Sequence, residues 1–154
     1  MKGIRILAVG HIKTQHWRDA AAHYAARLSR FLRLEEATVK DAAPELAPEA
    51  RKELETQRLL KLLQPRDTAL CLDERGIALD SRAFADLLRH LYESGKRPCF
   101  LIGGAYGLSE EARTTAARCL SLGPMTLPHE LARVVLLEQI YRAETILAGT
   151  GYHH

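Results

Sequence analysis

The sequence lacks a long run of apolar residues. None of its apolar segments approaches the roughly 20 consecutive residues that are needed to cross a bilayer. The apolar N-terminal segment Ile4–Val9 is too short for a signal peptide and is interrupted by Arg5. We therefore expect a cytoplasmic protein in which this segment forms a buried first strand, with no membrane partner.

Cysteine is also scarce. Cys71, Cys99 and Cys119 are odd in number, and their spacing matches no metal-binding motif. Cys71 and Cys99 lie inside apolar segments, which is typical of thiols that pack as small hydrophobic groups. Nothing in this pattern argues for a disulfide, which fits the reducing cytosol. We expect no metal centre.

A strong excess of charge of either sign is absent, because the formal net charge is only +3. This balance permits an RNA partner but does not require one. His23, Arg27 and Arg30 recur at helical spacing on one face of a predicted helix. They indicate either an ordinary solvated face or a stripe that contacts phosphates.

Several common catalytic motifs are missing. His129 begins the sequence His-Glu-Leu-Ala-Arg, in which the second histidine of a zinc protease does not appear. There is no Gly-x-Ser-x-Gly of the hydrolases. The glycine-rich segment 103–107 matches neither a dinucleotide-binding motif nor a P-loop.

The chain does contain a regular alternation of short apolar runs and amphipathic segments. Such alternation predicts a single α/β domain over residues 1–154, with a mostly parallel sheet flanked by helices. We expect strands over residues 4–9, 35–40, 68–72 and 98–102, and helices over 17–32, 49–63, 81–93 and 130–148. Residues 120–122 and 125–127 are two further short apolar segments, and Ser109 is expected to cap the start of another helix.

Three loops at predicted strand ends are candidates for a binding site. In open parallel sheets, ligands bind beyond the carboxyl ends of the strands. The loops are residues 73–76 after Leu72, the pair Gly103-Gly104, and residues 123–128. Their glycines are explained equally well by tight turns or by a backbone that a ligand approaches closely.

The last predicted helix is unusual because Val134–Leu137 is apolar on every face of one turn. A helix that is apolar all round is buried all round. We therefore expect its extra face to pack on a second subunit. Further along, Glu138 and Arg142 have the spacing of an ordinary helical ion pair.

Several recognisable groups of residues occur in a fixed order along nearly the whole chain. They are Leu72-Asp73-x-x-Gly76, Phe100–Gly104-x-x-Gly107-Leu108, Leu120–Leu122-x-x-Met125–His129, Arg133-Val134-x-Leu136-x-Glu138-Gln139-x-Tyr141–Ala143 and Tyr152-His153. In these groups the chain resembles the bacterial ribosomal RNA large subunit methyltransferase H family of the SPOUT superfamily.

The resemblance implies a trefoil-knotted α/β fold and a homodimer. It also implies that S-adenosylmethionine binds in the knot and that the enzyme methylates N3 of a pseudouridine in 23S ribosomal RNA of the assembled ribosome. Carried over by position, the cofactor-binding residues are Leu72, Gly104, Gly123, Pro124, Met125, Thr126, Leu127 and Pro128.

Four residues remain candidates for the catalytic group, namely His129, Arg142, Tyr152 and His153. N3 of pseudouridine carries a proton, so a base or a cation that stabilises negative charge should assist. The family often ends Tyr-His-Arg or Tyr-His-Lys, whereas this chain ends Tyr-His-His, and such a tail either frays or acts on the RNA base. The alternatives are a SPOUT methyltransferase for transfer RNA and a non-catalytic, ribosome-associated RNA-binding module.

Overall fold

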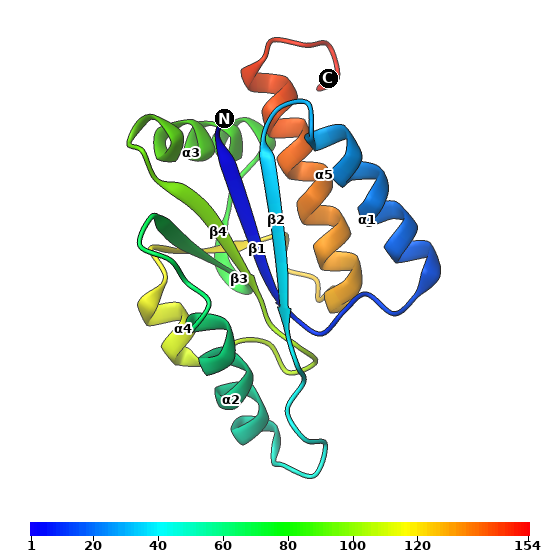
Figure 1. Cartoon of the computed structure of the whole chain (residues 1–154), viewed down its shortest axis with the longest axis vertical. Helices are drawn as coiled ribbons and strands as arrows, with labels where there is room; N and C mark the ends of the chain where they lie inside the picture. Colours follow the sequence, from blue (N-terminus) through cyan, green and yellow to red (C-terminus); the bar gives the residue numbers. More distant parts are fainter.

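The computed structural model describes all residues 1–154 and is built on one five-stranded sheet (Figure 1). Its strands are β1 (Gly3–Val9), β2 (Arg33–Val39), β3 (Asp67–Ala78), β4 (Arg97–Ile102) and β5 (Arg118–Ser121). They lie in the order β2-β1-β4-β3-β5, and all four neighbouring pairs are parallel. The predicted α/β class is confirmed, and the sheet is wholly rather than mostly parallel.

Four helices connect the strands, and a fifth follows the last strand. They are α1 (Gln15–Leu28), α2 (Pro48–Leu60), α3 (Ser81–Glu93), α4 (Glu110–Thr115) and α5 (His129–Leu147). The helices predicted over 17–32 and 49–63 both end earlier than expected, because their last residues form turns. Ser109 does cap α4, but its side chain makes no capping hydrogen bond. No helix combines the length and the apolar character needed to span a bilayer.

Alternate residues of each strand face two separate cores. In β1, Ile4, Ile6 and Ala8 face the core formed with α1, α3 and α5. Leu7 and Val9 face the smaller core on the other side, where α2 and α4 lie. This follows from the two-residue period of a strand, and it means that both faces of the sheet are covered.

Cys71 and Cys99 are fully buried in the smaller core, as predicted. Burial is the main cause that raises the pKa of each thiol to about 12. Both thiols are therefore protonated at neutral pH and cannot serve as nucleophiles.

The strand predicted to end at Leu72 extends to Ala78, which corrects the predicted boundary. Leu72 and Ile77 both pair with Leu120 of β5, so residues 73–76 form an irregularity in the ladder. A Cβ atom at Gly76 would lie 2.7 Å from the backbone carbonyl carbon of Cys119. Glycine is needed here because the irregular segment rests directly on the backbone of β5.

The all-round apolar turn of α5 is buried within a single chain. Helix α5 packs between α1 and α3 on one face of the sheet (Figure 1). Val134, Leu136 and Leu137 are buried there, and only Val135 of this turn is half-buried. The reason given above for a second subunit is therefore wrong, and the homodimer stays a prediction that rests on the family resemblance.

Candidate functional site

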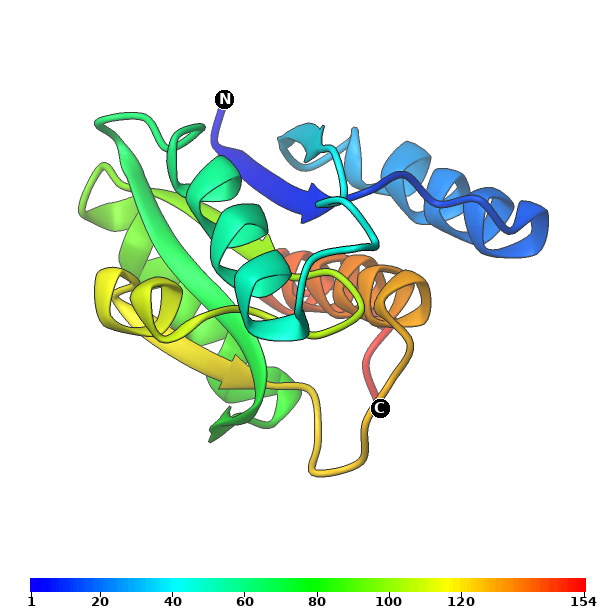
Figure 2. The ribbon, with the colours of Figure 1, turned by 90° about the horizontal axis from the view of Figure 1, so that it is seen from below.

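A pocket of about 770 Å³ lies beyond the carboxyl ends of β4 and β5 and beside the irregular segment 73–76 within β3. Figure 2 views the molecule from the side on which these strands end and shows the segment after β5 running back to α5. Three segments form most of the wall, namely Leu72–Arg75, Ile102–Leu108 and the residues from Leu122 to the first turn of α5. They coincide with the three segments that the strand pattern predicted as loops, although residues 73–76 lie within β3. The volume is in the range typical of small-molecule sites.

The pocket gathers most of the residues expected to hold the cofactor. Seven of them line it: Leu72, Gly104, Gly123, Met125, Thr126, Leu127 and Pro128. Pro124 is exposed and is not part of the lining. Thr126 donates a hydrogen bond of 2.6 Å from Oγ1 to Oε2 of Glu74, which ties the loop after β5 to the irregular segment of β3.

Gly104 is held in place by the packing behind the pocket. A Cβ atom at this position would lie 2.9 Å from Oε1 of Glu55 and 3.2 Å from Cγ1 of Val9. Glu55 is 2% exposed, and its other oxygen, Oε2, accepts the backbone N–H of Ala42 at 2.9 Å. Any larger side chain at Gly104 must therefore displace a buried carboxylate or move the loop into the pocket.

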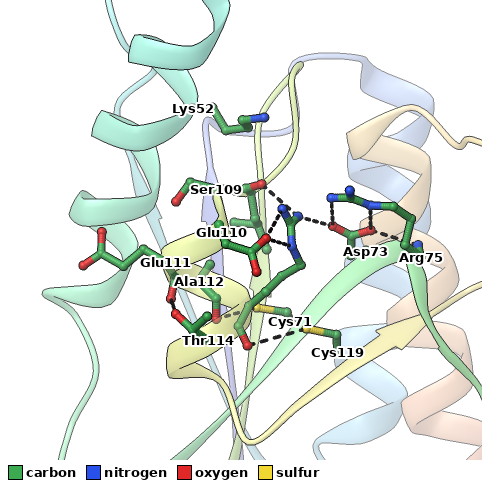
Figure 3. Close-up of polar contacts among 12 residues, drawn as sticks. Lys52, Cys71, Asp73, Arg75, Ser109, Glu110, Glu111, Ala112, Thr114 and Cys119 are labelled. Carbon is green, nitrogen blue, oxygen red and sulfur yellow. Dashed lines mark hydrogen bonds and ion pairs between the residues drawn. The ribbon is translucent and has the colours of Figure 1, made fainter.

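A charged network supports the floor of the pocket at Asp73 (Figure 3). Oδ2 of Asp73 accepts a hydrogen bond of 2.7 Å from Arg113 of α4, and Oδ1 accepts the backbone N–H of Arg75 at 2.8 Å. Arg113 also pairs with Glu110 at 2.7 Å. Burial acts to raise the pKa of Asp73, but the bonds from Arg75 and Arg113 lower it overall. Asp73 is therefore an ionised structural group whose acceptor sites are occupied.

The first turn of α5 forms another wall of the pocket. His129 is exposed and lines it. The next residue, Glu130, accepts the backbone N–H groups of Lys13 and Thr14, each at 3.0 Å. These bonds, with that of Thr14 the largest, lower the pKa of Glu130. Glu130 thus caps the start of α1 and fixes α5 against the loop after β1.

The other three catalytic candidates lie together elsewhere, far along α5 from His129. Arg142 follows His129 by 13 residues, which is about 20 Å along the helix axis. Its guanidinium lies 3.2 Å from Nδ1 of His153, and the rings of Tyr141 and Tyr152 meet edge-on at 4.8 Å. The tail after α5 therefore folds back onto its own helix (Figure 1), but it does not reach the pocket of the same chain.

One residue of the basic face of α1, Arg27, contacts the aromatic rings of α5 and the tail. Arg27 stacks over the ring of Tyr141 at 4.5 Å, whereas His23 and Arg30 are exposed. Arg142 pairs with Glu138 at 2.5 Å, as its spacing predicted. Tyr152 donates to Glu138 at 3.2 Å, and burial followed by the charge of Glu138 raises the pKa of this tyrosine. Its phenol is therefore protonated at neutral pH, which leaves it unsuited to act as a base.

Among the lining residues that sequence reasoning missed, Lys52 and Tyr106 have side chains that can contact a ligand. Lys52 reaches the pocket from α2, a helix whose sequence gave no sign of proximity to the strand ends (Figure 3). Tyr106 lies in the glycine-rich loop after β4, where the glycines were noticed but the aromatic ring between them was not. No group of three or more His, Cys, Asp or Glu side chains is placed to hold a metal ion.

Comparison with known proteins identifies the family. A family model described as a predicted SPOUT methyltransferase matches residues 1–153. The chain is 50% identical to ribosomal RNA large subunit methyltransferase H of Oleidesulfovibrio alaskensis, with 100% of both chains covered. It is 51% identical to the protein of the same name from Desulfovibrio desulfuricans, with 99% of this chain and 98% of that one covered.

Solved structures show the same fold at low sequence identity. A probable methyltransferase from Bordetella pertussis Tohama I has a TM-score of 0.58 and 17% identity, over 93% of this chain and 96% of that one. The SpoU methyltransferase AviRb from Streptomyces viridochromogenes, solved in complex with AdoMet, has a TM-score of 0.50 and 15% identity, over 97% of this chain and 59% of that one.

The chain belongs to the SPOUT methyltransferase family, and within it to the group of ribosomal RNA large subunit methyltransferase H. Its family and the AdoMet-bound neighbour support S-adenosylmethionine as the cofactor. The pocket suits that molecule, because it offers apolar walls such as Leu72 and Leu127, close backbone at Gly104, and charged groups at its rim. The trefoil knot stays a prediction that rests on the family.

Proposed function

We propose that this protein methylates N3 of a pseudouridine in 23S ribosomal RNA of the assembled ribosome, in the cytoplasm and as a homodimer. The observation that carries the proposal is the pocket at the ends of β4 and β5 and beside the irregular segment of β3, which gathers seven of the eight cofactor residues expected from the family. The names of the 50% identical relatives support the large-subunit RNA as substrate.

The cofactor-binding step falls to the three pocket loops. Gly104 and the segment 123–128 would hold S-adenosylmethionine through backbone groups, and Leu72 and Leu127 would cover apolar surface of the ligand. When bound, the cofactor supplies an electrophilic methyl group on a sulfonium centre. The protein contributes orientation, and positioning alone can provide about 7–11 kcal/mol of the barrier in such reactions.

The proton on N3 requires a second group near the pocket. His129 is the only one of the four candidates that lines the pocket of its own chain, so it can accept the N3 proton there. Arg142 is held as a cation by Glu138, whose hydrogen bond is the largest cause that raises the pKa of this arginine. A fixed guanidinium of this kind can stabilise the negative charge that develops on the base.

Arg142, Tyr152 and His153 can serve the reaction only from a second copy of the chain. Within one chain they lie about 20 Å along α5 from His129. In a symmetric dimer the tail of one protomer can meet the pocket of its partner, because a two-fold interface brings the same two surfaces together twice. We therefore expect a homodimer because the site needs the tail of a second chain, whereas the apolar turn of α5 gives no reason to expect one.

A ribosomal particle suits this chain better than free RNA does. One chain carries a net charge of only +3, and a dimer doubles that small value. Each phosphate contact steepens the salt dependence of binding by about 0.9 on a logarithmic scale for duplex DNA, and somewhat less for single strands. We expect weak binding to short RNA fragments and rapid methylation of ribosomes.

The test is mass spectrometry of ribosomal RNA nucleosides from cells with and without this protein. The proposal expects loss of one N3-methylated pseudouridine from 23S RNA and its restoration by purified protein, S-adenosylmethionine and ribosomes. A missing mark in transfer RNA would instead support the alternative transfer RNA enzyme. Unchanged RNA together with no cofactor binding in calorimetry would support a non-catalytic module. Equal rates on a short free hairpin and on ribosomes would contradict the assembled substrate.

A further inference from the structure

Tyr106 is a large aromatic side chain that the protein leaves half exposed at the mouth of its pocket. It is 49% exposed and lies at the tip of the loop between β4 and α4, with exposed neighbours Ala105 and Gly107. Position 106 lies outside the residues that carry the family resemblance, and no step of the proposed reaction uses it. A single exposed apolar side chain is ordinary on a protein surface, so a role for this ring is inferred from where it lies and from which groups lie beside it.

The loop that carries Tyr106 is held rigidly. Gly104 and Gly107 form an antiparallel bridge, and the N–H of Gly107 donates to the carbonyl oxygen of Gly104 at 3.0 Å. A Cβ atom at Gly103 would lie 2.5 Å from the carbonyl carbon of Gly107, so the two ends of the turn are in direct backbone contact. Gly107 adopts a φ of 81°, which glycine tolerates best. The tyrosine is therefore presented on a preorganised turn.

Cationic side chains of α2 lie beside the ring. The guanidinium carbon of Arg51 lies 5.2 Å from the ring centroid of Tyr106. Lys52, the next residue, lines the same pocket, and its ammonium pairs at 3.0 Å with Glu49, whose side chain is 77% exposed. Such exposed pairs contribute little to stability, so this ammonium can exchange Glu49 for another anion. An exposed aromatic ring backed by arginine and flanked by lysine is the chemistry that binds single-stranded nucleic acid.

We propose that Tyr106, backed by Arg51, is a stacking platform for a nucleotide next to the methylated one, with Lys52 facing its phosphate. The inference rests on the proposed function. A base that enters the pocket must leave its stack, so an adjacent base loses a stacking partner. Tyr106 supplies that partner at the rim. Stacking on the adenine of the cofactor is the competing role, and the cofactor Kd of a Tyr106 variant distinguishes the two.

The experiment measures methyl transfer to ribosomes that lack the modification, together with calorimetry of S-adenosylmethionine binding. Tyr106→Ala should raise the KM for ribosomes about fivefold or more, as expected for one lost base stack. Tyr106→Phe keeps the ring and should stay within about twofold of wild type, as should the cofactor Kd of both variants. Arg51→Ala should raise the same KM. Lys61→Ala, directly after the last residue of α2, and Leu46→Ala, another exposed apolar side chain, are the matched controls.

An unchanged KM for ribosomes in Tyr106→Ala would overturn the inference. Weakened cofactor binding with an unchanged ribosome KM would also overturn it and assign the ring to the cofactor. A Phe variant as poor as the Ala variant would mean that the hydroxyl, and not the ring, is used. If wild type binds cofactor but methylates no RNA, the proposed function fails separately. Binding of fluorescein-labelled oligouridine then decides the inference, with Tyr106→Ala expected to bind about fivefold more weakly and equal binding overturning it.

Discussion

The two ends of the parallel sheet both carry charged side chains, but these are used differently. At the amino ends of β1, β3 and β4, Arg5, Asp67 and Arg97 form a network in which the side chain of Asp67 is fully buried. At the carboxyl ends, the charged groups near the pocket include exposed ones, such as Glu74 and Arg75. The amino ends of the strands form the closed end of the sheet, where the charged groups pair with one another. The carboxyl ends form its open end, where a pocket is accessible to a ligand.

The difference shows how burial separates structural from functional charge. Asp67 accepts hydrogen bonds from Arg5 at 2.5 Å, from the backbone of Gln64 at 2.9 Å and from Arg97 at 2.7 Å, so its acceptor sites are occupied within the chain. Burial acts to raise the pKa of Asp67, but these bonds lower it overall. A charge whose partners are all internal stabilises the fold, whereas an exposed one at a pocket can act on a ligand.

The largest expected effect is at the closed end. Asp67→Ala leaves Arg5, which is 3% exposed, without its buried partner. Removing one member of such a pair costs about 3–5 kcal/mol. Urea denaturation should show this loss in the free energy of unfolding. Asp86→Ala, which removes an exposed partner of Arg89 on α3, is the control and should change stability by no more than about 0.5 kcal/mol. Equal effects of the two substitutions would contradict the contrast between the two ends.

At the open end, Gly104→Val should act on binding and not on the fold as a whole. The added side chain meets Glu55 and Val9 from behind and pushes the loop into the pocket. We expect S-adenosylmethionine to bind about a hundredfold more weakly, which is about 2.8 kcal/mol. Calorimetry checks the affinity, and circular dichroism checks that the variant is folded. Ala117→Val, at an exposed position outside the pocket, should bind normally. Wild-type affinity in folded Gly104→Val would remove this loop from the cofactor site.

Removing the tail tests whether residues 152–154 of one chain reach the pocket of a partner chain. Deletion of Tyr152–His154 should lower methyl transfer to ribosomes about tenfold, which is about 1.4 kcal/mol of transition-state stabilisation. Cofactor affinity should be preserved, because the tail does not touch the pocket of its own chain, and the shortened chain is expected to sediment as a dimer. Undiminished transfer would mean that the tail has only a structural role. Loss of cofactor binding would mean that the tail belongs to the cofactor site and not to the RNA site.

Mixing two impaired variants sharpens this test. A chain with Gly104→Val has an intact tail, and a chain without its tail has an intact pocket. Random exchange between symmetric dimers would restore about a quarter of the sites if the tail acts on the partner's pocket. The unmixed variants are the controls. A mixture no more active than its components would mean that the tail does not complete the site of another chain.

The smallest expected effect is the response to acid. Because the pKa values of Asp67 and Asp73 are lowered in the folded chain, their contributions to stability are fully present above the unfolded value of about 3.9 and are lost as the pH falls through the folded values. The free energy of unfolding should therefore decline below about pH 4. Asp73→Asn should flatten the decline in part, whereas Asp86→Asn, at an exposed site, should leave its slope unchanged.

The fold and the location of the pocket could be predicted because both follow from local patterns. Alternating strands and helices gave the α/β class, and the glycine-rich ends of the strands marked three loops that do line one pocket. The continuation of β3 to Ala78 could not be read, because it depends on a backbone contact between Gly76 and Cys119.

Long-range packing explains the other differences. The apolar turn Val134–Leu137 looked like a subunit interface, since no local signal shows that α1 and α3 cover it from both sides. Lys52 and Tyr106 were overlooked for a similar reason. A single side chain near a pocket produces no repeating pattern in the sequence from which its position could be predicted. His129 and the tail were proposed together, and only the three-dimensional arrangement separates them.

The strand order has a consequence for how the chain acquires its structure during synthesis. Leu7 of β1 pairs with Leu101 of β4, so the centre of the sheet cannot form until about two thirds of the chain has been made. Helix α5, which fills the space between α1 and α3, is translated later still. Contacts so distant in sequence slow folding. The nascent chain therefore exposes the apolar side of β1 and α1 until its last helix leaves the ribosome, and release before that helix would yield a chain with an open core.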